Sequence, residues 1–209
     1  MLDLFHKLIG FIRDPGPILD AGYPALFLVV FLETGALVFF LPGDSLLVTA
    51  GLYASAGKLS LVLLNLLLIP AAIIGDATSY YFGARTGPAL FNRPESRFFK
   101  PKHVKAAHDF YERHGGKAII IARFMPLVRT FVPVVAGVGK MPYRRFATFN
   151  VIGAAAWVLS MTLTGYLLGN LVPNIGKHIE KVILLVVFVS ILPGIVAYFR
   201  RGQTTPAAS

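Results

Sequence analysis

Five long runs of apolar residues, separated by shorter polar stretches, dominate the pattern along this chain. They cover 21–41, 59–75, 118–139, 146–171 and 182–199. A helix needs about 20 mostly apolar residues to cross a bilayer, and several of these runs reach or approach that length. A membrane-spanning strand barrel would show weak alternating segments instead of solid apolar runs. The pattern therefore predicts an all-α integral membrane protein.

Composition agrees with this prediction, and the charge distribution adds an orientation. The chain is 56% hydrophobic and 14% charged, whereas a soluble domain carries about 25% charged residues. Eight Lys/Arg and three acids lie between positions 85 and 117, and further basic clusters lie at 140–145 and 200–201. We interpret all three clusters as cytoplasmic, where membrane-protein loops are rich in Lys and Arg. On this interpretation they contact anionic membrane lipids, and no nucleic acid is expected as a partner.

This orientation predicts how the apolar runs cross the membrane. The segments 59–87, 146–171 and 182–199 each cross once. The run 118–139 has cytoplasmic charges on both flanks, so it enters and leaves at the same face as a re-entrant hairpin. Proline and glycine break it, as Pro42-Gly43 breaks the first run. The segment 21–57 then begins and ends outside, or crosses once with a broken return. Two broken hairpins that open to opposite faces, each followed by a crossing helix, are typical of inverted-repeat transporters.

The resulting domain organisation has one membrane domain with short flanking segments. Residues 1–20 are expected to form an N-terminal interfacial helix, and 21–199 the membrane domain. The two re-entrant hairpins within it span about 21–57 and 118–142, with a basic cytoplasmic loop at 88–117. Residues 200–209 are expected to form a flexible cytoplasmic tail.

Five charged residues lie within or beside the apolar runs, namely Glu33, Asp44, Asp76, Arg123 and Arg129. An intramembrane charge costs at least about 2.5–3.5 kcal/mol on insertion scales, so it is expected to pair or to face a cavity. Two acids belong to the first hairpin and both arginines to the second, so the opposite charges can face each other if the hairpins meet. Static ion pairs that fix the hairpin register are the alternative interpretation.

The candidate roles follow from the chemistry of these side chains. Glu33 is the better candidate for proton exchange. Asp44 directly follows Pro-Gly, so it is either a second such group or a cap for the next helix. Arg123 and Arg129 flank Pro126, and a break there would aim both inward. Because arginine stays charged and binds phosphate in a bidentate way, a phosphorylated lipid headgroup is their expected ligand, although chloride or a fixed carboxylate would also satisfy them.

Other polar or small residues in the apolar runs are given supporting or packing roles. Asp76 and Gly43 are candidates for supporting positions near the charged residues. Asn150 and Trp157 are interpreted mainly as packing and interface residues, with Asn150 kept as a supporting candidate. Small residues let helices approach closely in lipid, and this packing role is assigned to the glycines of the 59–87 helix: Gly75, Gly83 and Gly87.

Sequence motifs of enzymes are missing. The chain has no cysteine, which excludes disulfides and cysteine-based metal or redox sites. Its five histidines lie outside the main apolar runs and match no zinc motif. There is no nucleophile elbow, phosphate-binding Walker loop or HExxH. We expect a transporter with no metal or cofactor, and not an enzyme.

Three motifs carry a family resemblance: ETG with LPGDSLL, then GDATSYYFGARTG, then FYERHGGKAIIIARFMPLVRTFVPVVAGVGKMPYRRFATFNVIGAAAW. The chain resembles the DedA family of bacterial inner-membrane proteins, within the SNARE-associated/VTT domain superfamily, over about residues 25 to 195. The resemblance implies two re-entrant hairpins among transmembrane helices, and a relation to eukaryotic lipid scramblases. The family's essential acids match Glu33 and Asp44, and its essential arginines match Arg123 and Arg129.

The resemblance also implies a function. Family members are implicated in returning undecaprenyl phosphate, an anionic lipid carrier, across the bacterial inner membrane in dependence on the proton gradient. The chain is accordingly expected to be a multi-pass inner-membrane flippase for this lipid, and a homo-oligomer is left open. The alternatives are an energy-independent scramblase, a proton antiporter for small ions or drugs, and a non-transporting assembly factor for membrane proteins.

Overall fold

The computed structural model describes residues 16–36, 43–91 and 116–171, and all regular secondary structure within these ranges is helical. The prediction of an all-α protein is confirmed. The helices are α2 (Gly16–Asp20), α3 (Tyr23–Gly35), α4 (Gly43–Ser55), α5 (Leu61–Phe91), α7 (Lys117–Arg123), α8 (Pro126–Val138) and α9 (Tyr143–Leu171). The predicted crossing at 182–199, the tail at 200–209 and residues 1–15 of the predicted N-terminal helix lie outside the described residues.

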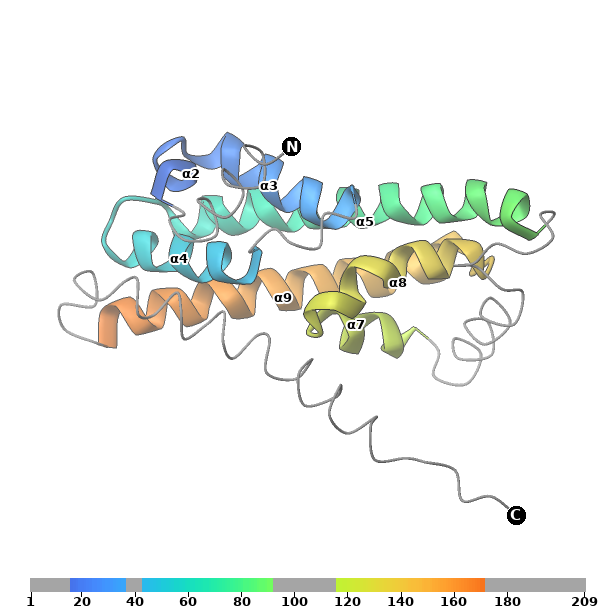
Figure 1. The fold of residues 1–209 in the computed structure, drawn as a ribbon. Helices are drawn as coiled ribbons and strands as arrows, with labels where there is room; N and C mark the ends of the chain where they lie inside the picture. The colour runs from blue at the N-terminus through green and yellow to red at the C-terminus, as the bar shows by residue number, and fades with distance from the viewer. Residues whose placement is uncertain (1–15, 37–42, 92–115, 172–209) are drawn as a thin grey trace, which may run out of the picture.

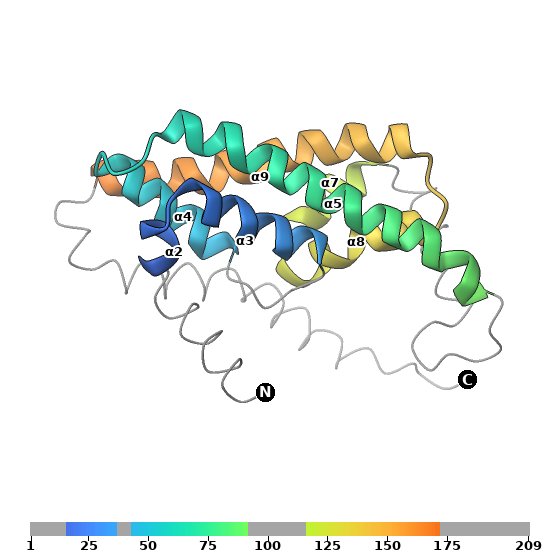
Figure 2. The same ribbon diagram turned by 90° about the horizontal axis from the view of Figure 1, so that it is seen from above.

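Two long helices, α5 and α9, extend along the whole molecule and pack against each other in opposite directions (Figures 1 and 2). They contain 31 and 29 residues, which at about 1.5 Å per residue exceeds the thickness of a bilayer's hydrocarbon core. Both are apolar enough to cross a membrane, over Leu61–Gly87 and Tyr143–Leu171. α5 continues through Gly87 and Pro88 to Phe91, into the first residues of the predicted loop 88–117. The rest of that loop, 92–115, lies outside the described residues.

The other principal helices are too short to cross a membrane. α3, α4 and α8 each contain 13 residues and α7 contains seven, so none is longer than about 20 Å. We call α3 with α4 the first helix pair, and α7 with α8 the second helix pair. The first pair lies against one end of the long helices and the second against the other end. In each pair, the first helix ends and the second begins near the middle of the molecule (Figures 1 and 2).

The packing of the two helix pairs repeats in an inverted way. α3 packs on α5, the long helix that follows it, and α4 packs on α9. In the second half, α7 packs on α9, the long helix that follows it, and α8 packs on α5. If α3–α5 and α7–α9 are taken as two halves, the second short helix of each half packs on the long helix of the other half. This order of elements is the one predicted from the sequence, whereas re-entry of the two pairs into the membrane stays a prediction.

Glycines allow the close crossings between the two halves. A Cβ on Gly51 or Gly165 would lie 2.1 or 1.9 Å from a backbone oxygen of the facing helix, so α4 and α9 meet backbone to backbone. Gly83 and Gly137 play the same part between α5 and α8, where the corresponding distance is 2.1 Å for each. The packing role predicted for Gly75, Gly83 and Gly87 is confirmed.

The described part of the chain combines exposed apolar side chains with buried charges. Large apolar side chains such as Val62 and Leu66 are 70% and 65% exposed, whereas Glu33, Asp76 and Arg123 are at most 4% exposed. Charged residues are almost never buried in soluble proteins unless they are paired. An apolar surface, with paired charges buried inside an otherwise apolar core, suits a lipid environment.

Candidate functional site

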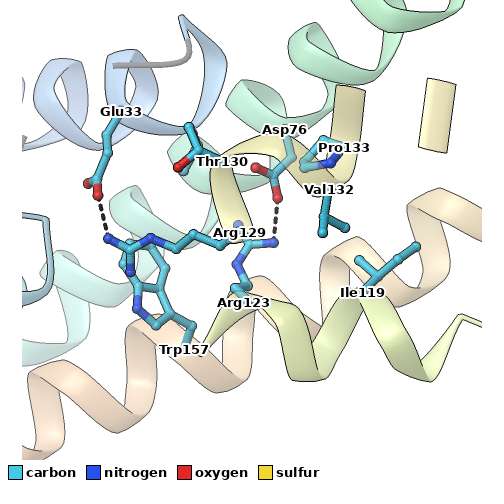
Figure 3. A pocket seen from close by; sticks show the side chains of 10 residues that line it. Glu33, Asp76, Ile119, Arg123, Arg129, Thr130, Val132, Pro133 and Trp157 are labelled. Carbon is cyan, nitrogen blue, oxygen red and sulfur yellow. Dashed lines mark hydrogen bonds and ion pairs between the residues drawn. The ribbon is translucent and has the colours of Figure 1, made fainter. Parts of the chain in front are cut away.

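One arginine joins the two helix pairs where their breaks meet. Arg129, in the first turn of α8, donates hydrogen bonds from Nη2 to Glu33 Oε1 and from Nη1 to Asp44 Oδ1. Glu33 lies near the end of α3 and Asp44 at the start of α4. The three side chains are 9%, 3% and 11% exposed, respectively. The prediction that acids of the first pair face an arginine of the second is confirmed for Arg129, and Figure 3 shows Glu33 and Arg129 pointing toward one another.

Asp44 lies inside α4 and makes its hydrogen bonds with other elements. The helix already begins at Gly43, so Asp44 occupies its first turn. Its Oδ1 accepts a hydrogen bond from Trp157 Nε1 at 2.8 Å in addition to the one from Arg129. The sequence left open whether Asp44 belongs to the charged site or caps α4. These two bonds favour a place in the charged site.

The absence of a side chain at Gly43 leaves room for the Glu33 carboxylate. A Cβ on Gly43 would lie 1.7 Å from Glu33 Oε2 and 2.5 Å from its carboxyl carbon. The carboxylate therefore packs directly on the glycine backbone, and any side chain here would displace it. The supporting position predicted for Gly43 has this physical basis.

The second arginine forms a separate network. Arg123, the last residue of α7, donates from Nη1 to Asp76 Oδ2 and, at 2.8 Å, to Asn150 Oδ1. Asn150 Nδ2 in turn donates to the Ile73 carbonyl at 3.1 Å. The expectation that Arg123 faces the acids of the first helix pair is therefore wrong. Arg123 lies over the middle of α5, so Asp76 is the carboxylate within its reach.

Asn150 and Trp157 are buried between helices, as the packing interpretation expected, but both also contact the charged networks, which that interpretation missed. Asn150 is 1% exposed and holds Arg123 on α5, while Trp157 is fully buried beside both arginines. The centre of the Trp157 ring lies 4.7 Å from Arg129 Cζ and 5.7 Å from Arg123 Cζ. A signal was present in the sequence, because membrane-interface tryptophans lie at the ends of apolar runs. Trp157 lies well inside the run 146–171.

A small cavity lies between the two networks, lined by residues of both, including Glu33, Asp76, Arg123, Arg129 and Trp157 (Figure 3). Its free volume is about 10 Å³, which is room for about one water molecule. Arg123 Nη2 is buried and has no hydrogen-bond partner among the described residues. The arrangement is a nearly closed site in which carboxylates bind three of the four terminal guanidinium nitrogens, namely Nη1 and Nη2 of Arg129 and Nη1 of Arg123.

Comparison with known proteins identifies the family. The model of the VTT domain matches residues 41–167, which include every site residue described above except Glu33. The chain belongs to the VTT-domain (DedA) family.

Among the described residues, no group of three or more His, Asp or Glu side chains is close enough together to hold a metal ion.

Several proteins of known sequence are similar to this VTT-domain chain. It is 46% identical to Protein DedA of Escherichia coli strain K12 over 190 residues, covering 90% of this chain and 86% of that protein. It is 43% identical to an uncharacterized membrane protein of Mycobacterium leprae strain TN over 188 residues, covering 89% and 84%. It is 37% identical to the E. coli K12 inner membrane protein YqjA over 149 residues, covering 71% and 68%. No solved structure matches the chain. Together with its two membrane-capable helices, these similarities make the chain a VTT-domain membrane protein.

Proposed function

We propose that this protein is a proton-linked flippase, which moves an anionic polyprenyl-phosphate lipid such as undecaprenyl phosphate across the bacterial inner membrane. The observation that carries the proposal is the position of Arg129. It bridges acids of the opposite helix pair, at the level where the two pairs meet. The proposed role is transport and not catalysis, and it uses the proton gradient and no cofactor.

Competition for the same donors would link lipid and proton binding. Glu33 and Asp44 together occupy both terminal nitrogens of Arg129. A phosphate group binds arginine through the same pair of donors, with similar geometry. The cavity has room for about one water molecule, so a phosphate must displace the carboxylates. Protonation of Glu33 and Asp44 would remove their charge and free Arg129 for the lipid.

The charge balance supports proton binding at this site. The described interior holds three carboxylates, on Glu33, Asp44 and Asp76, and two guanidinium groups, on Arg123 and Arg129. One carboxylate is thus in excess, and a buried uncompensated charge is strongly unfavourable. Uptake of a proton is the simplest way to neutralise it.

The inverted arrangement supports alternating exposure of the site to the two faces of the membrane. The helix pairs approach from opposite ends, and transporters with such repeats expose a central site by rocking one half against the other. Exposed cations gather where α5 ends and α9 begins, namely Arg85, Lys140, Arg144 and Arg145, whereas the turn before α5 carries Lys58. By the positive-inside rule this basic end faces the cytoplasm.

The test is flipping of a fluorescent polyprenyl phosphate in proteoliposomes, with and without an imposed pH gradient. The proposal predicts gradient-dependent flipping that is lost in Glu33→Gln and Arg129→Ala. Lys58→Gln, which changes an exposed charge far from the site, is the matched control and should transport normally. Flipping that ignores the gradient would replace the proposal with a scramblase. An absence of flipping by folded protein would leave a small-ion antiporter or an assembly factor.

A further inference from the structure

Trp157 lies between the two ion networks and contacts both. It is fully buried near the middle of α9. Its ring faces the guanidinium groups of both Arg129 and Arg123, and its Nε1 donates to Asp44. Figure 3 shows it beside the end of the Arg129 side chain. Trp157 belongs to the hydrophobic core and, in addition, contacts two cations and an acid.

The contacts of Trp157 and those of the carboxylates use different parts of each arginine. An aromatic ring attracts a guanidinium through its face, whereas carboxylates and phosphates bind the N–H groups at its edge. The ring can therefore hold Arg129 in place while the groups at the edge exchange. Since the indole Nε1 is only a donor, an anion that replaces Asp44 would find a further N–H directed at it.

We propose that Trp157 is a substrate-positioning residue, which keeps the two arginines in place during exchange and donates Nε1–H to the oxyanion that displaces Asp44. This inference rests on the proposed function and concerns the same site. The ligand it implies is a phosphate monoester on an apolar chain.

Phe146 supplies a matched control on the same helix. It is also fully buried, and its ring stacks on Tyr80 at a centroid distance of 4.6 Å. None of its ring contacts in the described part of the chain involves an arginine. Replacing Phe146 by Leu should therefore cost stability without changing how the site binds an anion.

The first measurement uses intrinsic fluorescence, because Trp157 is the sole tryptophan of the full chain. Farnesyl phosphate is titrated into the wild-type protein in nanodiscs, with farnesol as the control lacking the phosphate. Farnesyl phosphate should change the Trp157 emission in a saturable way and farnesol should not. Inorganic phosphate in a third titration shows whether the headgroup alone suffices.

The second measurement separates the N–H group from the ring. Trp157→Phe keeps an aromatic face but has no N–H, so the KM for flipping farnesyl phosphate should rise about tenfold while kcat changes little. Trp157→Leu removes both, and its KM should rise about a hundredfold. Phe146→Leu should keep the wild-type KM. If Trp157→Leu does not fold, the KM of Trp157→Phe compared with that of the wild type still tests the inference.

Each outcome decides between the inference and the function on which it rests. If the wild type flips farnesyl phosphate but Trp157→Phe keeps its KM, or the emission does not respond, the inference is wrong and the proposed function stands. If the wild type neither binds nor flips farnesyl phosphate, both are wrong.

Discussion

Replacing both partners of the Glu33–Arg129 ion pair by neutral residues tests whether the pair serves transport or only stabilises the fold. Arg129 holds two nearly buried carboxylates, so Arg129→Gln leaves both without a cation. Breaking a buried pair by removing one partner costs about 3–5 kcal/mol. The combined variant Glu33→Gln with Arg129→Gln leaves one carboxylate and no guanidinium, which restores the wild-type net charge of this group.

The two variants should therefore differ in stability but not in transport. We expect Arg129→Gln to lower the free energy of unfolding by about 3–5 kcal/mol. The double variant should recover most of this loss, because the two amides can hydrogen-bond each other and Asp44 keeps the donor of Trp157. Neither variant should flip lipid, since both lack the guanidinium that would bind phosphate at position 129, and the double variant also lacks the carboxylate that would bind a proton at position 33.

Reversible unfolding in mixed micelles gives the stabilities, and flipping in proteoliposomes gives the transport rates. A double variant that is stable and still transports would refute the proposed mechanism, because the pair would then act only as a static link. An Arg129→Gln protein as stable as the wild type would refute the assigned contacts themselves.

Three further substitutions test single contacts. Gly43→Ala places a methyl group against the Glu33 carboxylate, and it should lower the unfolding free energy by about 1–3 kcal/mol and slow flipping. Asn150→Ala removes one acceptor from buried Arg123, and a loss of about 1–3 kcal/mol is expected in the same unfolding assay. Gly165→Val forces α4 away from α9, because a side chain there meets the backbone of Val48, and we expect a lower thermal midpoint. Unchanged stability in Gly43→Ala, Asn150→Ala or Gly165→Val would contradict the contact that the substitution tests.

The sequence predicted the order of elements because the physical signals are strong in an apolar chain. Solid apolar runs indicated the long helices, and the Pro-Gly step before Asp44 indicated a break between α3 and α4. Both breaks appear in the structure where charged residues interrupt an apolar run. The end of α5 was missed, because Gly and Pro are weaker helix breakers where neighbouring helices support the backbone.

The sequence predicted which charged residues form the site better than it predicted which arginine pairs with which acid. The sequence identified all five charged residues of the site, because a charge inside an apolar run is costly and is usually kept for a function. They are Glu33, Asp44, Asp76, Arg123 and Arg129. Which arginine meets which acid depends on the packing of α7 on α9 and of α8 on α5, and spacing along the chain carries no information about it. Arg123 was therefore assigned to the wrong acids.

Trp157 was missed for a related reason. Its type and position fit ordinary packing in a membrane helix, and its significance comes from two arginines on other elements. Only the fold brings those three side chains together.

The central claim is that lipid and proton movements share one site, and proton flux driven by lipid alone tests it most directly. Proteoliposomes with a pH-sensitive dye inside, and no initial pH gradient, would receive polyprenyl phosphate in the outer leaflet only. The account predicts a change in internal pH that follows lipid entry and is absent in Glu33→Gln. Lipid entry at the wild-type rate without any proton movement would contradict it.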